Sequence, residues 1–125
     1  MTDEIRKSVG LQELIKMEGN EKKFQYKGYN CEIKRIEGSG HLCGYVELPF
    51  QKLSDELQEI PHGGVTYRKV TEQGNVVIGF DCAHEFDRLP FVESHDDCYY
   101  TYCDMGFVEG ELKKMVDYLE KEGIR

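Results

Sequence analysis

The sequence has few of the features that mark exported, membrane-spanning or disordered proteins. It contains no tryptophan, only three prolines and no apolar run near the roughly 18 residues that a membrane span requires. The first residues, MTDEIRKS, are charged and lack the apolar core of a secretory signal. The scarcity of proline and the even spread of apolar residues argue against a long disordered tail. We therefore expect a cytoplasmic protein that is ordered along nearly its whole length and does not bind a membrane.

The cysteines lack the pattern of a disulfide framework. There are five, an odd number; none belongs to a CxxC pair, and no export signal accompanies them. A chain of 125 residues can bury enough apolar surface in one domain to fold without disulfides or a structural metal ion. A single domain over residues 1–125 with reduced thiols is expected.

Basic residues are almost missing from one part of the chain. Residues 81–111 hold nine acidic side chains against Arg88 as the one base, a balance of −8 that equals the formal net charge of the whole chain. A surface of this sign repels a phosphate backbone, so nucleic-acid binding is not expected. A small anionic ligand would need basic groups elsewhere, such as Arg35 or Arg68.

Strand-like segments occupy the middle of the chain and helix-like segments its ends. The sequence predicts hairpins over residues 24–33 and 65–80, with HLCGYVEL (41–48) as a strand between them. It predicts an N-terminal helix that Gly10 interrupts, a short middle helix and a C-terminal helix capped by Asp104. The expected fold is α+β, an antiparallel sheet of about five strands with one face covered by the C-terminal helix.

Residues 82–103 show neither a helical nor a strand period. A structureless stretch of about 20 residues is uncommon inside a compact domain and often serves as a lid or a binding loop. We therefore expect this stretch to cover a ligand site.

Three short segments carry residues suited to chemistry. GSGHLCGY places His41 and Cys43 two positions apart, and hence on one face of a strand. HGGVTY sets His62 before two glycines whose backbone amides can approach an anion closely. IGFDCAH ends a predicted strand with Asp81 and continues to His84. Each segment taken singly also fits a packed edge or an ordinary turn, but together they predict one ligand pocket.

The candidate ligand-binding residues come from these segments and their neighbours. They are His41, Cys43, Tyr45, His62, Gly63, Gly64, Thr66, Arg68, Asp81, His84 and Asp87. In this set the glycine amides and arginine suit phosphates, the tyrosine suits stacking on a base, and the carboxylates suit ribose hydroxyls. If the protein is an enzyme, His62 and His84 would act as acid and base, with Asp81 orienting His84.

Metal binding and nucleophilic catalysis are weaker alternatives. A zinc site of Cys43, His62, Asp81 and His84 can be drawn, but no zincin motif or paired CxxC supports it. No cofactor is therefore predicted, and zinc stays open. Cys82 or Cys43 beside a histidine would be a candidate nucleophile, but the nearby carboxylates raise the pKa of a thiol.

GHLCGYV, HGGVTY and IGFDCAH together resemble a pattern of small, mostly uncharacterised proteins of phages, prophages and bacteria, in which GHxCGYV, HGGxTY and FGFDCAH occur in this order. The resemblance covers roughly residues 29–110. Members often follow the last motif with a glycine and an aspartate, whereas here Glu85 and Phe86 precede Asp87. The family has no established catalytic residues, so the resemblance implies positions and not roles.

The resemblance implies a function in the cytoplasm of a bacterial host. Small phage proteins are often counter-defence proteins, including those that trap the nucleotide signals of Thoeris or cyclic-oligonucleotide immunity. We therefore expect a protein that binds and sequesters a small nucleotide signal, of ADP-ribose or cyclic-nucleotide type. Two alternatives stay open: a hydrolase that cleaves such a signal by His/Asp acid–base chemistry, and an acidic inhibitor that binds a basic protein surface. A homo-oligomer is compatible with each.

Overall fold

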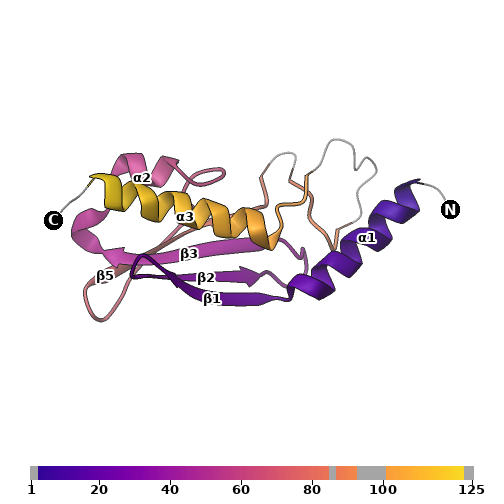
Figure 1. The fold of residues 1–125 in the computed structure, drawn as a ribbon, viewed down its shortest axis with the longest axis horizontal. Helices are drawn as coiled ribbons and strands as arrows, with labels where there is room; N and C mark the ends of the chain where they lie inside the picture. Colours follow the sequence, from indigo (N-terminus) through magenta and orange to yellow (C-terminus); the bar gives the residue numbers. More distant parts are fainter. Residues whose placement is uncertain (1–2, 85–86, 93–100, 123–125) are drawn as a thin grey trace.

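The structure is a computed structural model that describes residues 3–84, 87–92 and 101–122, with residues 3–9 described by their backbone alone. The helices are α1 (Asp3–Glu18), the 3-10 helix η1 (Phe50–Lys52), α2 (Asp55–Glu59) and α3 (Met105–Glu122). The strands are β1 (Glu21–Tyr26), β2 (Tyr29–Arg35), β3 (Leu42–Pro49), β4 (Tyr67–Val70) and β5 (Asn75–Asp81). The predicted α+β fold, with its N-terminal, short middle and C-terminal helices, is confirmed (Figure 1).

The five strands form one antiparallel sheet in the order β1-β2-β3-β5-β4. The two predicted hairpins are its outer parts, and the tight turn of the first uses the positive φ angles of Lys27 and Gly28. β3 lies at the centre and pairs with β5, which sets Cys43 opposite Asp81. This register brings the first and third sequence motifs to the same end of the sheet.

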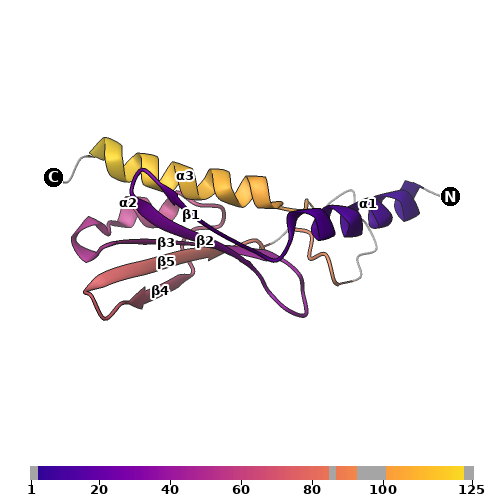
Figure 2. The ribbon, with the colours of Figure 1, turned by 60° about the horizontal axis from the view of Figure 1, so that its bottom comes forward.

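α3 covers one face of the sheet, while none of the described helices covers the other face (Figure 2). Val108 of α3 packs with Val46 and Phe80 of the sheet, and all three are at most 1% exposed. Gly44 permits this close approach, because an added Cβ would lie 2.8 Å from Phe80 and 2.9 Å from Val108. No described helix is both long and apolar enough to cross a bilayer.

α1 continues through Gly10, so the prediction that this glycine divides the helix is wrong. A glycine in a helix costs only about 1 kcal/mol relative to alanine, too little to force a break. The end of α1 is tied to the sheet by Arg35, which forms an ion pair of 2.9 Å with Glu18 and donates to the backbone oxygens of Gly19 and Gly40. The Arg35 side chain is 3% exposed, and its charge is therefore already taken up by these contacts.

Part of the stretch predicted as a lid lies outside the described residues, namely 85–86 and 93–100. The described part is attached to its surroundings: the Arg88 amide donates to Thr101 O at 2.8 Å, and the Phe91 amide donates to Ser39 O at 3.0 Å. The Asp104 side chain accepts the Phe107 amide at 2.8 Å, which confirms the predicted N-cap of α3.

Candidate functional site

Parts of all three motifs lie at one end of the sheet, beside the start of α3. His41 directly precedes β3, His62 follows α2, Asp81 ends β5 and His84 lies three residues beyond it. We call the mutually contacting polar groups at this end the histidine cluster. It consists of His62, Asp81, His84, Asp87 and Cys103.

Asp87 is the centre of the histidine cluster. Its side chain is 5% exposed, and its two oxygens lie 2.9 and 2.8 Å from His62 Nε2. Oδ2 also accepts the backbone N–H of His84 at 2.9 Å, and Oδ1 accepts from Cys103 Sγ at 3.6 Å. A carboxylate removed from water is costly unless such donors surround it. Asp87 therefore fixes both the His62 ring and the backbone at His84.

A second imidazole and carboxylate meet beside this pair. His84 Nε2 lies 3.3 Å from Asp81 Oδ1, and Asp81 also accepts from the Thr66 hydroxyl at 2.8 Å and the Ala83 amide at 3.1 Å. The approach of His84 to Asp81 is an electrostatic contact, because Nε2 is buried and makes no well-formed hydrogen bond within the described residues. The rings of His62 and His84 meet edge to face, with centroids 5.6 Å apart.

The HGG segment is shaped by the His84 ring. Gly63 and Gly64 have φ angles of 71° and 80°, a region that glycine adopts without strain. A Cβ at Gly63 would lie 2.1 Å from His84 Nε2, so only glycine leaves room for the ring. The Gly64 amide donates to Pro61 O at 2.8 Å. This amide serves the turn, and the phosphate contact predicted for it would require the turn to open.

His41 stands at the margin of the histidine cluster. Its Nδ1 lies 2.6 Å from Ser39 Oγ. Burial lowers the pKa of His41; the carboxylates of Asp81 and Asp87 oppose this shift, and His84 adds to it. The imidazole is therefore neutral at pH 7, and His41 is close enough to the cluster to sense its charges.

The two thiols considered as nucleophiles are both buried. Burial raises the pKa of Cys43 to about 11. The pKa of Cys82 is raised by its hydrogen bond with Cys103 and by burial. Both groups remain protonated at neutral pH, which argues against a thiolate nucleophile at either position.

Cys103 is the site residue that sequence reasoning missed. Its Sγ lies 4.0 Å from His62 Nε2, and the ligand atoms of Cys103, His62 and Asp87 all lie within 4.8 Å of one another. No spacing signals it, because 16 residues separate Cys103 from Asp87 and the predicted motifs end before either. Among the described residues, the group whose atoms are spaced like metal ligands is therefore His62, Asp87 and Cys103. It shares only His62 with the zinc site drawn from the sequence.

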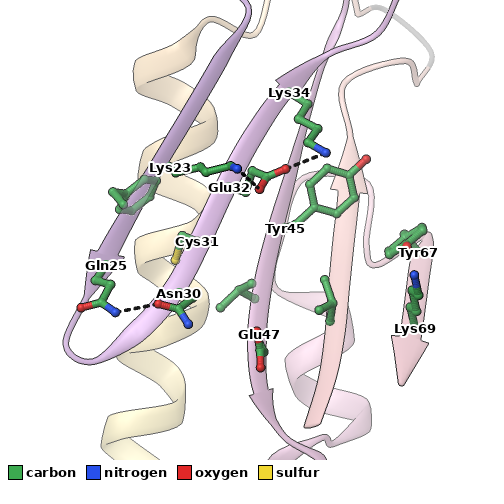
Figure 3. Close-up of a pocket in the computed structure, with 13 residues that line it drawn as sticks. Lys23, Gln25, Asn30, Cys31, Glu32, Lys34, Tyr45, Glu47, Tyr67 and Lys69 are labelled. Carbon is green, nitrogen blue, oxygen red and sulfur yellow. Dashed lines mark hydrogen bonds and ion pairs between the residues drawn. The ribbon is translucent and has the colours of Figure 1, made fainter. Parts of the chain in front are cut away.

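A groove of about 690 Å³ crosses the face of the sheet that α3 leaves uncovered. In Figure 3 the side chains of Glu32, Lys34 and Tyr45 stand on the near face, with α3 behind the sheet. The rings of Tyr45 and Tyr67 meet edge to face with centroids 5.3 Å apart, and the Tyr45 ring rests on Gly79. The groove is lined by Lys23, Phe24, Gln25, Asn30, Cys31, Glu32, Lys34, Tyr45, Val46, Glu47, Tyr67, Lys69 and Val77.

The tyrosine end of the groove leads towards the histidine cluster. Tyr45 and Tyr67 both pair with Gly79, which is two residues before Asp81 on β5. Two residues of an extended strand span about 7 Å. Thr66, directly before Tyr67, donates to Asp81. A ligand resting on the tyrosines would therefore end close to the cluster, although no cluster residue lines the groove.

Arg68 lies apart from both regions. Its neighbours Tyr67 and Lys69 line the groove, so Arg68 projects from the other side of β4, where it hydrogen-bonds to Gln58 of α2. With Arg35 committed to the end of α1, neither arginine expected to hold phosphates lies in the cluster or the groove. The basic groups that line the groove together with the tyrosines are Lys23, Lys34 and Lys69.

Comparisons with protein families, with curated proteins and with solved structures gave no match. No residue role is therefore carried to this chain from another protein. The histidine cluster and the groove are interpreted from their own geometry.

Proposed function

We propose that this protein binds a small anionic ligand of nucleotide type in the groove and sequesters it. The observation that carries the proposal is the groove itself, whose volume of about 690 Å³ suits a small molecule. Small-molecule sites typically span roughly 300–1,000 Å³. The rings of Tyr45 and Tyr67 suit a base, and the lysines suit phosphates.

The charges in the groove support an anionic ligand. Three lysines and two glutamates line it, a local balance of +1 in a chain of formal net charge −8. Glu32 pairs with Lys23 at 3.9 Å and with Lys34 at 2.8 Å, while Lys69 has no ion-pair partner within the described residues. A phosphate would gain most from Lys69 and would share Lys34 with Glu32.

Sequestration agrees with the lining of the groove, which contains neither histidine nor aspartate. The histidines that could act as acid and base lie outside it, so a ligand held wholly within the groove would not meet them. The motif resemblance to phage proteins supports a counter-defence role, in which the ligand is a nucleotide immune signal in the cytoplasm of a bacterial host. Such a trap removes the signal without altering it.

A second candidate is a hydrolase, and the histidine cluster favours it. His62 is held by Asp87, His84 lies against Asp81, and the two rings are 5.6 Å apart. Two imidazoles with carboxylate partners can serve as acid and base in phosphodiester or pyrophosphate cleavage. A ligand longer than the groove would bring its phosphates to this cluster. The acidic-inhibitor alternative gains no support, because much of its acidic segment lies outside the described residues.

The deciding experiment incubates the purified protein with a panel of cyclic dinucleotides, cyclic trinucleotides and ADP-ribose derivatives, followed by chromatography before and after heat denaturation. A sequestering protein depletes one compound and releases it intact on heating. The Tyr67→Ala variant should lose this depletion, whereas Phe50→Ala, an exposed aromatic outside the groove, should keep it.

The other outcomes separate the candidates. The hydrolase would be established by a new compound that persists after heating. The His84→Gln variant should no longer produce this compound, although at high protein concentration the variant should still deplete the panel compound. No depletion of any compound by the folded protein would refute both proposals.

A further inference from the structure

We propose that His62, Asp87 and Cys103 form a zinc-binding site. This inference goes beyond the proposed function, because it concerns the histidine cluster and requires no nucleotide. The three residues come from distant parts of the sequence. Their ligand atoms nonetheless lie within 4.8 Å of one another at the start of α3.

The separations of the ligand atoms match those around a tetrahedral metal. Zn–N and Zn–O bonds of about 2.0–2.1 Å and a Zn–S bond of about 2.3 Å place neighbouring ligand atoms roughly 3.3–3.6 Å apart. Here Asp87 Oδ1 and His62 Nε2 are 2.9 Å apart, Asp87 Oδ1 and Cys103 Sγ 3.6 Å, and Cys103 Sγ and His62 Nε2 4.0 Å. Shifts of about half an ångström would accommodate the ion.

The ligand types select zinc among the common ions. A thiolate does not suit Mg²⁺ or Ca²⁺, which take oxygen ligands, whereas sulfur, imidazole nitrogen and carboxylate oxygen together suit Zn²⁺. Three protein ligands are also the number found where zinc keeps its fourth position for water or a small ligand. The site is thus of the kind that can do chemistry as well as support a fold.

The groups around the three ligands are arranged as in metal sites. The His84 amide donates to Asp87 Oδ2 and so orients the carboxylate. The Phe107 ring meets the His62 ring edge to face, with centroids 5.4 Å apart, and so helps to fix the orientation of the imidazole. Cys82, which is 2% exposed, lies beside Cys103 and shields it from solvent on that side.

His84, beside the three ligands, has a buried ring nitrogen without a hydrogen bond. Its Nε2 lies 3.3 Å from Asp81 Oδ1 but makes no hydrogen bond of acceptable geometry with the described residues, and its ring packs on that of the ligand His62. A buried polar atom without a hydrogen bond is uncommon, and an ion or its bound water is one of the recognised explanations.

The contacts among the three ligands also fit a metal-free arrangement in which Asp87 accepts from both His62 and Cys103. The two states differ at the sulfur, because zinc binds the thiolate and displaces the thiol proton. A test must therefore detect sulfur–metal bonding and not merely a change in stability.

The test uses the tag-free full-length chain, stripped with a chelator, desalted and shown to be folded by circular dichroism. Titration with Co²⁺, a spectroscopic substitute for zinc, should give the absorption of a four-coordinate site with a thiolate-to-cobalt charge-transfer band. Saturation should occur at one ion per chain, and added Zn²⁺ should abolish the spectrum.

Variants assign the ligands. Cys103→Ser should remove the charge-transfer band and weaken zinc binding by about 100-fold, since even second-shell changes cost about 10–100-fold. Cys43→Ser, a matched change at another buried thiol, should leave the charge-transfer band and the zinc affinity unchanged. If Cys103→Ser does not fold, Asp87→Asn serves in its place and should keep the sulfur band while weakening the affinity at least about tenfold.

Two results would overturn the inference. One is a folded wild-type chain that gives no cobalt spectrum, and the other is a charge-transfer band that survives Cys103→Ser. Because only metal ions are added, a failure of nucleotide binding has no bearing on either result.

Discussion

Asp81 of the histidine cluster lies two residues along β5 from Gly79, with which the groove tyrosines pair, but the two regions place their polar groups in opposite surroundings. In the cluster the Asp87 side chain is 5% exposed, and the imidazole, amide and thiol around it are all directed at its oxygens. In the groove Lys23 and Lys34 have side chains 69% and 53% exposed, and their ion pairs with Glu32 remain in contact with water.

This difference decides what each region contributes. A buried polar group is costly when its partner is removed, so the residues of the histidine cluster depend on one another. Exposed ion pairs contribute little to stability and can exchange partners with a ligand. Substitutions in the cluster should therefore change folding and chemistry together, whereas substitutions in the groove should change binding alone.

The largest expected effect is that of Asp87→Ala. The change leaves the His84 amide and the donors of His62 and Cys103 without their acceptor, so the free energy of unfolding should fall by about 3 kcal/mol. Urea unfolding monitored by circular dichroism, with a chelator present so that only hydrogen bonding is measured, checks it.

Two matched variants frame this prediction. Asp87→Asn keeps one acceptor oxygen and should lose a smaller part of the stability, and Asp55→Ala, an exposed carboxylate in α2, should lie within about 0.5 kcal/mol of the wild type. Equal stability of Asp87→Ala and Asp55→Ala would contradict the contrast between the two regions.

Gly63→Ala should have the next largest effect. The new methyl group enters a position with φ of 71° and would lie 2.1 Å from His84 Nε2, so the ring must move and stability should fall by about 2 kcal/mol. Gly10→Ala is the opposite control: its Cβ would meet nothing within 4 Å in α1, and stability should rise by up to about 1 kcal/mol. Histidine ring signals in the NMR spectrum should shift for Gly63→Ala only.

Tyr67→Ala tests the groove side of the comparison. Removing a ring on which a base stacks should weaken binding of the depleted nucleotide by about tenfold, since such stacking contributes roughly 1–3 kcal/mol per base. The Tyr67 side chain is 41% exposed, so the unfolding midpoint should hardly change. Isothermal titration calorimetry and urea unfolding measure the two quantities, and a variant that loses stability without losing affinity would reverse the assignment.

The fold was predictable because its signals are local. Alternating apolar residues at the hairpins, the Asp104 cap and the helical spacing of residues such as Val108 and Leu112 each depend on a few neighbours in sequence. Gly10 was the exception, because a single glycine lowers helix propensity without preventing a helix.

The site was predictable only in part. Period-two patterns placed His41 and Asp81 at strand ends, and antiparallel pairing then brought those ends together. Arg35 and Cys103 could not be assigned in this way. Arg35 is buried by its pairing with Glu18 across the end of α1, and Cys103 reaches Asp87 across a polar stretch without periodicity. Long-range polar contacts of this kind leave no trace in local spacing.

The smallest expected effect lies at the margin of the histidine cluster, where His41 is half-buried. Burial lowers its pKa in the folded chain below the ordinary 6.5, so the unfolded chain binds more protons between these two values. Stability should therefore fall as the pH drops from 6.5 towards the pKa of the folded state, and then level off with respect to this group. His41→Gln should flatten that part of the pH profile, and NMR titration of the His41 ring gives the folded pKa directly. A His41 midpoint at or above 6.5 would mean that Asp81 and Asp87 outweigh burial there, and that the surroundings of the histidine cluster are more polar than the contacts of Asp87 imply.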